Sequence, residues 1–587
     1  MKLLLVAVNA KYIHSNLAVY SLKAYTERYL PDNNQQPVQL SLAEYTINHS
    51  EEDILAGIFR EKADLVALSC YIWNIDLILR ITAELKKVSP RVKLWLGGPE
   101  VTYDAIQCLE KQPELDGIML GEGEQTFLEL VEHYAYGSRE LGEIAGLAYR
   151  DIALNRIVVT KERQPLTLDT IPFPYEEGTG FENKIIYYES SRGCPFSCSY
   201  CLSSVDRRVR HRDIELVKRE LQILLDRKVP QVKFVDRTFN CNKQHAMELW
   251  RFIKDRDNGI TNFHFEISAD LLEENEITFL ASLRPGQVQF EIGVQSTNPD
   301  TVEAICRKMD LNKVKKNVAL IKNSGNIHQH LDLIAGLPLE DYASFEQSFR
   351  EVYSMKPDQL QLGFLKVLKG SPMEHSVKEY GIVYRDTAPY EVLTTDRLTY
   401  EEILKLKGIC EMVEMYYNSG QFGYAVAYLV HFYPSPMKLY EEIYEFYENK
   451  KMFLLAHSRI RRYEILLDFY KDRILERNAR ERGPGGMSTE ADLLLLFEEI
   501  LLFELYLRED LKSRPKFAPG KPKYNFKELY DKHRMEYQQF HIESFSFDPE
   551  LSAREGRAIR QETILLFDYD RRDPLSHSAA YHRLQLS

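Results

Sequence analysis

Residues Ser190–Ser204 read SSRGCPFSCSYCLSS and contain three of the eight cysteines of the chain. Cys194, Cys198 and Cys201 have the spacing C-x3-C-x2-C. Thiols this close together in a chain without a secretion signal indicate metal or redox chemistry rather than disulfides. Three thiolates on a 4Fe–4S cluster leave one iron open, as a reactive site requires. The alternatives are a structural zinc site or a four-cysteine cluster, with Cys241 as the fourth ligand.

The overall composition is that of an ordinary globular protein. The chain has 587 residues, of which 44% are hydrophobic and 28% are charged. The net charge of −13 disfavours nucleic acid and acidic membranes as partners. The apolar start MKLLLVAVNAKY is too short for a membrane span, and LLLLFEEILLFELYL contains three glutamates. We therefore expect a cytoplasmic protein without membrane segments.

Apolar runs alternate with helical patterns in the first part of the chain. KLLLVAVN, DLVALSCY, VKLWLGG and DGIML are strand-like, and amphipathic segments separate them. This alternation predicts an α/β fold with a doubly wound, Rossmann-like parallel sheet in residues 1–140. Residues 141–180 are predicted to form a hairpin and a linker.

A second alternating series predicts a partial β/α barrel in residues 181–375. Its strand-like runs are KIIYYESS, QVKFVD, NFHFEIS, VQFEIGV, QHLDLIAG and QLQLGFL. The cysteine stretch follows the first of these strands, so it belongs on the catalytic face. Residues 376–587 are predicted to be mainly helical, with the strand-like pair FHIESFSF and ETILLFDY near the end.

The cysteine stretch resembles the fingerprint of the radical S-adenosylmethionine (radical SAM) superfamily. That fingerprint is C-x3-C-x-φ-C, and Tyr200 is the aromatic φ residue here. The resemblance implies that the three thiolates hold a 4Fe–4S cluster whose open iron binds the amino and carboxylate groups of SAM. Reduction then splits SAM to a 5′-deoxyadenosyl radical, which abstracts hydrogen from the substrate. It also implies an oxygen-sensitive protein.

Later segments resemble the same superfamily in the expected order. VKFVDRTFN, FEISAD, FEIGVQSTNPD and LDLIAGLP match strand ends that face SAM, and Arg307 matches a family arginine. The resemblance implies SAM contacts from Tyr200, Asp236, Ser268, Gln295, Ser296 and Leu337.

The first domain resembles the cobalamin-binding domain that precedes the barrel in one class of these proteins. The matching stretches are LSCYIWN, GGPEVT and GEGE, and their glycines lie where backbone can approach a ligand closely. The resemblance implies that cobalamin is held by Asn9, Ser69, Tyr71, Gly97, Gly98, Pro99, Glu100, Gly121, Glu122 and Glu124. The last 210 or so residues resemble the C-terminal domain of uncharacterised members of this class.

One departure concerns the lower cobalt ligand. Many cobalamin domains carry D-x-H-x-x-G after the first strand, whereas Asn9–His14 read NAKYIH, with Lys11 at the histidine position. We therefore expect no histidine ligation of the usual kind and place His14 in a loop. Methylthiotransferases, which have a related architecture, are set aside. The first domain has only Cys70 and Cys108, and the C-terminal region is helical.

The predicted activity is cobalamin-dependent methyl transfer to an unactivated carbon of an unknown substrate, with an electron donor such as flavodoxin or ferredoxin. Two alternatives stay open: radical cyclisation, rearrangement or oxidation without methyl transfer, and a non-catalytic cofactor or redox sensor. Arg207, Arg208 and Arg210 are candidate contacts for an anionic group. The sequence assigns no catalytic residue.

Overall fold

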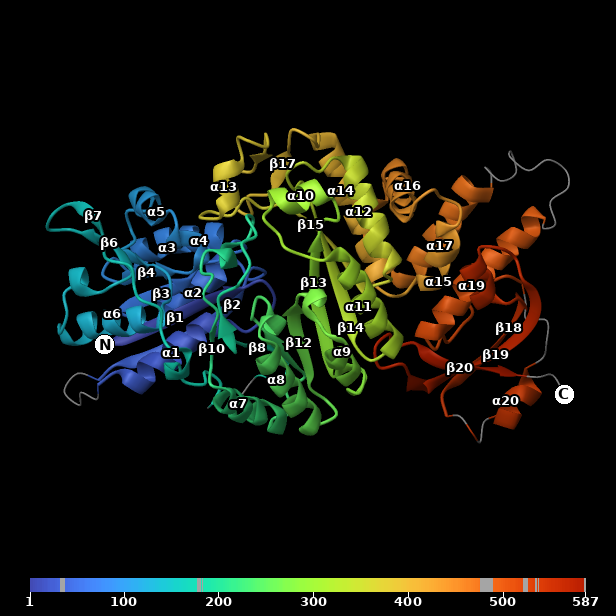
Figure 1. The fold of residues 1–587 in the computed structure, drawn as a ribbon, viewed down its shortest axis with the longest axis horizontal. Coiled ribbons are helices and arrows are strands. Elements are labelled where there is room, and N and C mark those ends of the chain that lie inside the picture. The colour runs from blue at the N-terminus through green and yellow to red at the C-terminus, as the bar shows by residue number, and fades with distance from the viewer. Residues whose placement is uncertain are drawn as a thin grey trace.

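The chain folds into three regions that follow one another along the long axis of the molecule, from blue through green to red in Figure 1. This computed structural model describes residues 1–31, 37–176, 181, 183–475, 489–520, 526–533, 536 and 538–584. Residues 177–180 of the predicted linker lie outside the described residues. The predicted fold class is confirmed: a doubly wound sheet, a partial barrel and a mainly helical C-terminal region.

The first region is built on a seven-stranded sheet of order β2-β1-β3-β4-β5-β6-β7. β1 to β5 are parallel, and β6 and β7 add an antiparallel hairpin to the edge of β5. The strands span Lys2–Asn9 (β1), Gln39–Thr46 (β2), Leu65–Ser69 (β3), Lys93–Gly97 (β4), Gly117–Met119 (β5), Leu147–Asp151 (β6) and Arg156–Val159 (β7).

Helices cover both faces of this sheet because the strands are apolar on both sides. Alternate residues of β1 belong to two hydrophobic clusters: Leu4 packs with Ile54 of α2, and Leu5 packs with Phe127 of α6. Asn16 caps α1 and Ser50 caps α2 through their side-chain oxygens. The helices span Leu17–Tyr29 (α1), Glu51–Arg60 (α2), Ile75–Val88 (α3), Pro99–Thr102 (α4), Ala105–Lys111 (α5) and Glu124–Tyr136 (α6).

The second region is a six-stranded parallel sheet of order β15-β14-β13-β12-β11-β8. Its strands span Ile185–Tyr188 (β8), Gln231–Phe234 (β11), Asn262–Ile267 (β12), Val288–Gln295 (β13), His328–Ala335 (β14) and Gln359–Phe364 (β15). The helices on it span Ile214–Asp226 (α7), Lys243–Asp255 (α8), Glu274–Leu280 (α9), Pro299–Ala304 (α10), Leu311–Ser324 (α11), Tyr342–Ser354 (α12) and Pro372–Ser376 (α13).

Strands of the second sheet alternate between two environments. In β13, Val288, Phe290, Ile292 and Val294 are fully buried, whereas the residues between them are partly exposed. The buried set packs in the main core with the covering helices. The other set is mostly polar, so the inside of this partial barrel is lined mainly by charged, imidazole and amide side chains instead of an apolar plug.

The third region carries most of the helices that follow the barrel. They span Tyr400–Val413 (α14), Gly423–Val430 (α15), Pro436–Asn449 (α16), Arg459–Phe469 (α17), Glu490–Arg508 (α19), Lys527–His533 (α20) and Pro549–Glu555 (α21). Short strands Val383–Tyr384 (β16) and Val392–Thr394 (β17) precede them. The predicted strand pair is β18 (Phe540–Phe547) and β19 (Arg560–Arg572), and β20 (Ala579–Leu584) adds a third strand that the sequence did not predict.

The first region joins the open edge of the barrel. His14 forms a parallel bridge with Ile185 of β8, and the Ile185 amide donates to the carbonyl of Ile13 at 2.7 Å. The Ser15 hydroxyl donates to the Ile185 carbonyl at 2.9 Å. The loop after β1 therefore continues the second sheet beyond its edge strand. Among the described residues, every helix is too short or too polar to cross a membrane.

Candidate functional site

The cysteine loop, residues 193–209, begins at the carboxyl end of β8. A two-residue ladder closes its base, where β9 (Ser191–Arg192) pairs with β10 (Arg210–His211). Cys194 and Cys198 are buried and Cys201 is partly buried. Gly193 has a φ of 100°, and a Cβ there would collide with the carbonyl oxygen of Arg208. The loop thus needs a glycine directly before its first cysteine.

The far side of the loop rests on the barrel. The Ser199 amide donates to the Ile305 carbonyl at 2.9 Å, and the Met373 amide donates to the Ser199 carbonyl at 2.8 Å. Arg307 approaches the loop from the same side, with Nη1 3.7 Å from Cys198 Sγ and 3.2 Å from the Tyr200 hydroxyl. Burial raises the pKa of the Cys198 thiol, and the Arg307 charge opposes that rise.

The donor set of this loop fits an iron–sulfur cluster. All eight cysteines of the chain are free thiols, so none of the three in the loop is held in a disulfide. The Arg307 guanidinium beside Cys198 suits a thiolate. Among the described residues, no three His, Cys, Asp or Glu side chains converge on a position for a single metal ion. Cys241 lies near enough to Cys194 for their charges to interact.

Asp236 supports the cysteine loop from below. It is 1% exposed and accepts hydrogen bonds from the Ser190 hydroxyl at 2.6 Å and the Ser191 hydroxyl at 2.6 Å. Its second oxygen accepts from the Ser190 amide at 3.0 Å. Burial raises the pKa of Asp236 to about 6, and the serine hydrogen bonds work against that rise. The side chain therefore ties the end of β11 to the residues that lead into the loop.

A large cavity of about 770 Å³ lies between the first region and the barrel. All the residues predicted for cobalamin line it except Glu100: Asn9, Ser69, Tyr71, Gly97, Gly98, Pro99, Gly121, Glu122 and Glu124. The cysteine loop supplies the facing wall through Gly193, Leu202, Ser203, Val205 and Asp206. The two predicted cofactor regions therefore share one cavity.

Gly98 shows why glycine is needed at the wall of this cavity. Its φ is 117°, and a Cβ would collide with the Cys70 carbonyl oxygen. Such an approach of one strand end to the next lets the backbone border a ligand. Tyr71 and Trp73 form an aromatic wall nearby, with ring centroids 4.4 Å apart and planes within 6°. These observations fit a large ligand with flat groups, as cobalamin is.

Glu100 points away from the cavity. It is 6% exposed and accepts a hydrogen bond from the Tyr390 hydroxyl, and Lys369 Nζ lies 3.4 Å from it. Burial raises the pKa of Glu100, whereas Tyr390 and Lys369 oppose the rise. Glu100 thus fastens α4 to the segment that follows β15.

His14 lies in the segment after β1, where it was placed from the sequence, and it also lines the cavity. Its Nδ1 lies 2.8 Å from the Tyr187 hydroxyl, and Asn9 Nδ2 donates to its carbonyl at 3.1 Å. Burial, followed by the charge of Lys11, lowers the pKa of His14. The loop is therefore held by hydrogen bonds to the barrel and to β1.

A smaller cavity of about 270 Å³ opens at the carboxyl ends of β13 to β15. It is lined by Tyr200, Gln295 and Asp332 together with residues of β15 and the segment after it. Gln295 has a φ of 72° at a bulge in β13, and its buried Oε1 has no hydrogen-bond partner among the described residues. An unpartnered buried acceptor beside a cavity fits a ligand with donor groups.

The other residues predicted to contact SAM do not line this cavity. The Ser296 hydroxyl donates to Glu340 at 2.6 Å, and the Ser268 hydroxyl donates to Asp270 at 2.7 Å. Leu337 is buried in the core. Together with Asp236, these residues shape the strand ends that carry Gln295 and the cysteine loop.

The interior of the barrel holds an ion-pair network. Glu291 Oε2 lies 2.9 Å from Lys233 Nζ and 3.1 Å from His264 Nε2. Burial would raise the pKa of Glu291, but His264 and Lys233 hold it well below its ordinary value. Asp332 lies above this network, and burial followed by the charges of Glu291 and Glu266 raises its pKa.

Several site residues were missed by the sequence reasoning. Asp332, Trp73 and Tyr187 line the two cavities, and Arg192 lies beside the first cysteine. The polar residues within β11 to β14, at alternate positions of otherwise apolar strands, were the signal that could have found Asp332. Of the candidate anion contacts, Arg208 pairs with Asp206 at 3.2 Å and Arg210 pairs with Glu122.

Three family models match the chain in succession. Residues 3–131 match the B12 binding domain, residues 188–352 match the radical SAM superfamily, and residues 378–570 match DUF4080, a protein family of unknown function. The chain therefore carries, in this order, a region that matches the B12 binding domain, a region that matches the radical SAM superfamily and a region that matches DUF4080.

Curated relatives cover about half of the chain. An uncharacterised methyltransferase of Pyrococcus horikoshii is 28% identical over 55% of this chain and 72% of its own length. The cobalamin-dependent radical SAM methyltransferase TokK of Streptomyces tokunonensis is 26% identical over 54% of this chain and 49% of its own. An anaerobic magnesium-protoporphyrin IX monomethyl ester cyclase of Rubrivivax gelatinosus is 25% identical over 53% of this chain and 57% of its own length. The chain thus spans only about half the length of the last two.

Solved structures share the fold. One match is the radical S-adenosylmethionine methyltransferase TsrM of Kitasatospora setae, with cobalamin and a 4Fe–4S cluster bound. Its TM-score is 0.54 and its identity 16%, and the match covers 66% of this chain and 78% of TsrM. Another match is the cobalamin-dependent S-adenosylmethionine radical enzyme OxsB with aqua-cobalamin bound. Its TM-score is 0.54 and its identity 16%, and the match covers 86% of this chain and 80% of OxsB.

Proposed function

We propose that this protein is a cobalamin-dependent radical SAM enzyme that transfers a methyl group to an unactivated carbon of a substrate yet to be identified. One observation carries the proposal: the cysteine loop and the glycine turns of the B12-binding domain line the same 770 Å³ cavity. A substrate in that cavity touches both regions, as a reaction that uses both cofactors requires.

The chain supplies the ligands and the shape of the site. Cys194, Cys198 and Cys201 would hold the 4Fe–4S cluster, and the glycine turns at Gly97–Gly98 and Gly121 would border cobalamin. When bound, these groups supply the electron that cleaves SAM and the methyl group that is transferred. Arg307 balances the thiolate charge at Cys198.

The smaller cavity is the proposed position of part of SAM. Tyr200, Gln295 and Asp332 line it, and the unpartnered Oε1 of Gln295 is an acceptor for a SAM hydroxyl or amino group. Four further residues stay part of the proposed SAM site because they support these strand ends: Asp236, Ser268, Ser296 and Leu337. The proposed domain division remains 1–140, 141–180, 181–375 and 376–587.

Anaerobic reconstitution with iron, sulfide and hydroxocobalamin tests the proposal. We expect bound iron and cobalt, SAM cleavage to 5′-deoxyadenosine on reduction, and S-adenosylhomocysteine from regeneration of the methyl donor. The triple variant Cys194→Ala, Cys198→Ala, Cys201→Ala should lose its iron but keep cobalamin. Full iron content in that variant would falsify the cluster assignment.

The same assay separates the alternatives. Deoxyadenosine without S-adenosylhomocysteine in the presence of substrate would favour cyclisation, rearrangement or oxidation. Bound cofactors with no SAM cleavage at all would favour a sensor. The eight free thiols support a reducing cytoplasmic location, and an electron donor of the flavodoxin or ferredoxin type is part of the proposal.

A further inference from the structure

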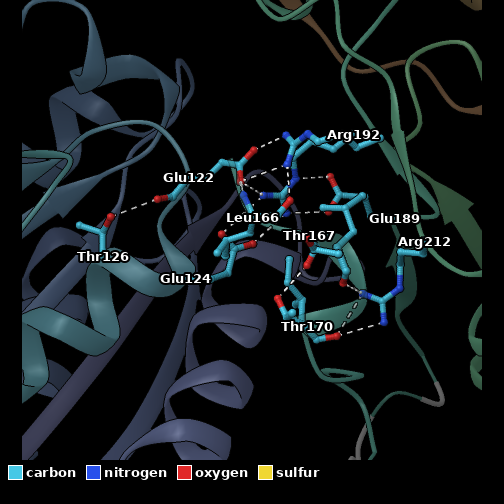
Figure 2. Close-up of polar contacts among 12 residues, drawn as sticks. Glu122, Glu124, Thr126, Leu166, Thr167, Thr170, Glu189, Arg192 and Arg212 are labelled. Atoms are coloured by element: carbon cyan, nitrogen blue, oxygen red, sulfur yellow. Dashed lines mark hydrogen bonds and ion pairs between the residues drawn. The ribbon is translucent and has the colours of Figure 1, made fainter. Parts of the chain in front are cut away.

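A cluster of ion pairs joins the cysteine loop to the B12-binding domain. We call it the Arg192 cluster: Glu122, Glu124, Glu189, Arg192 and Arg210. Figure 2 shows Arg192 reaching from the barrel side toward the carboxylates of Glu122 and Glu124. Arg192 Nη2 lies 2.8 Å from Glu124 Oε1 and 2.7 Å from Glu189 Oε2, and Nη1 lies 3.3 Å from Glu122 Oε2. Arg210 pairs with the other oxygen of Glu122.

The two arginines stand at the base of the cysteine loop. Arg192 is two residues before Cys194, and it pairs in the ladder with Arg210 at the other end of the loop. Both guanidiniums therefore leave the same short stem. Any movement of this stem would move the three cysteines with it.

The two glutamates stand at the edge of the large cavity. Glu122 lies in the turn that follows β5, and Glu124 begins α6. Both line the cavity, but their oxygens are already used inside the protein. Glu122 Oε2 also accepts from the Leu166 amide at 3.1 Å. Carboxylates with their acceptor positions filled by arginine are poor ligands for a neutral cofactor, in contrast to what the sequence resemblance implied.

Burial makes these pairs strong constraints. The Glu124 side chain is 7% exposed, and those of Glu122 and Arg192 are 19% and 22% exposed. Charges held this far from water cost much if either partner is lost. The Arg192 fork contacts three carboxylates, which fixes its orientation as well as its distance.

We infer that Glu122 and Glu124 are positioning residues that fix the cysteine loop against the B12-binding domain, and that they bind neither cofactor. The inference rests on the proposed function only for what is positioned: the separation between the iron–sulfur cluster and cobalamin. The contact between the two domains stands without it.

The double variant Glu122→Gln, Glu124→Gln tests this inference. Glu189 still neutralises Arg192 in that variant, so no buried guanidinium is left without a carboxylate. The matched control is Glu129→Gln, which removes a carboxylate of similar burial from its pair with Arg163 but leaves the domain contact intact. Arg192→Lys is a second variant that keeps the charge and loses the fork.

Hydrogen exchange and hydroxocobalamin titration are measured on each protein. We expect amides of residues 193–209 to exchange about tenfold faster in the double variant and in Arg192→Lys, since a lost buried pair costs at least that factor. Hydroxocobalamin affinity should stay within about threefold of the wild type. In the reduced holoenzyme, pulsed electron paramagnetic resonance should show a broader distribution of distances between the cluster and cob(II)alamin.

Two results would overturn the inference. A tenfold or greater loss of hydroxocobalamin affinity with unchanged loop exchange would make the glutamates cofactor ligands. Unchanged exchange and unchanged affinity would show that the cluster positions nothing. If wild-type protein binds no cobalamin, the proposed function fails, yet loop exchange still decides whether the cluster holds the two domains together.

Discussion

The two large sheets of this molecule both have a parallel core, but they are used differently. Each strand of β1 to β4 in the first sheet packs side chains on both faces, whereas β11 to β14 in the second sheet pack only one. The first sheet therefore acts as a solid support, and its cavity lies at the edge where the strands end. The second sheet is curved around polar side chains, so its interior can take part in binding.

Among the charged-residue variants that test this contrast, Glu291→Ala should cause the largest loss in the free energy of unfolding. The variant leaves the Lys233 ammonium, which is 24% exposed, without its carboxylate, and we expect this to cost about 3 kcal/mol, the lower end for a buried pair. Leu94→Ala in the first sheet should cost about 2–5 kcal/mol by leaving a cavity. Urea unfolding at several pH values separates the two.

Only the Glu291 variant should change the pH profile. The pKa of Glu291 lies below its ordinary value in the folded protein, so its contribution to stability is present above the unfolded pKa and is lost as pH falls. The Leu94 loss should be the same at every pH. A pH-independent loss for Glu291→Ala would contradict the ion-pair network.

Glu266→Gln should change the free energy of unfolding by less, and the contribution of Glu266 should depend on pH in the opposite direction to that of Glu291. Burial raises the pKa of Glu266 to about 7, and Arg237 opposes the rise. Its contribution to stability is therefore complete below the unfolded pKa and is lost as pH rises through about 7. We expect the variant to gain about 1–2 kcal/mol relative to wild type at pH 8, since the side chain is 25% exposed and partly screened. Urea midpoints from pH 5 to 8 measure this, and an unchanged slope would count against it.

Trp73→Ala tests the edge of the first sheet. Its ring stacks on Tyr71 and is 44% exposed at the cavity wall. We expect hydroxocobalamin affinity to fall by about fivefold, because one aromatic contact is worth about 1 kcal/mol. Absorbance titration measures the affinity, and Trp73→Phe is the matched control that keeps a ring. Equal hydroxocobalamin affinity in the wild type and both variants would show that the Tyr71–Trp73 pair does not contact cobalamin.

His14→Ala should give the smallest effect. The visible spectrum of bound cobalamin should be unchanged, because Lys11 stands at the usual ligand position and His14 is bonded to Tyr187. A spectral shift in the variant would mean that His14 ligates cobalt.

The sequence predicted those features that depend on local pattern. Alternating strands and helices gave both sheets, and the glycines at positions 97, 98 and 121 gave the wall of the large cavity. The partners of Glu100 and Glu124 were not predictable. Tyr390 is 290 residues from Glu100, and Arg192 is 68 residues from Glu124. Such pairs form only when whole domains dock, and no periodicity within either segment reports them.

The bridge between His14 and Ile185 has a consequence for how the chain assembles. An unpaired edge strand such as β8 is a template for aggregation. During synthesis the first domain leaves the ribosome ahead of β8 and can fold before it. The loop after β1 is then ready to occupy the outer edge of β8 as soon as that strand appears. The domain that borders the cavity thus also protects the edge strand β8 from aggregation while the barrel is being synthesised.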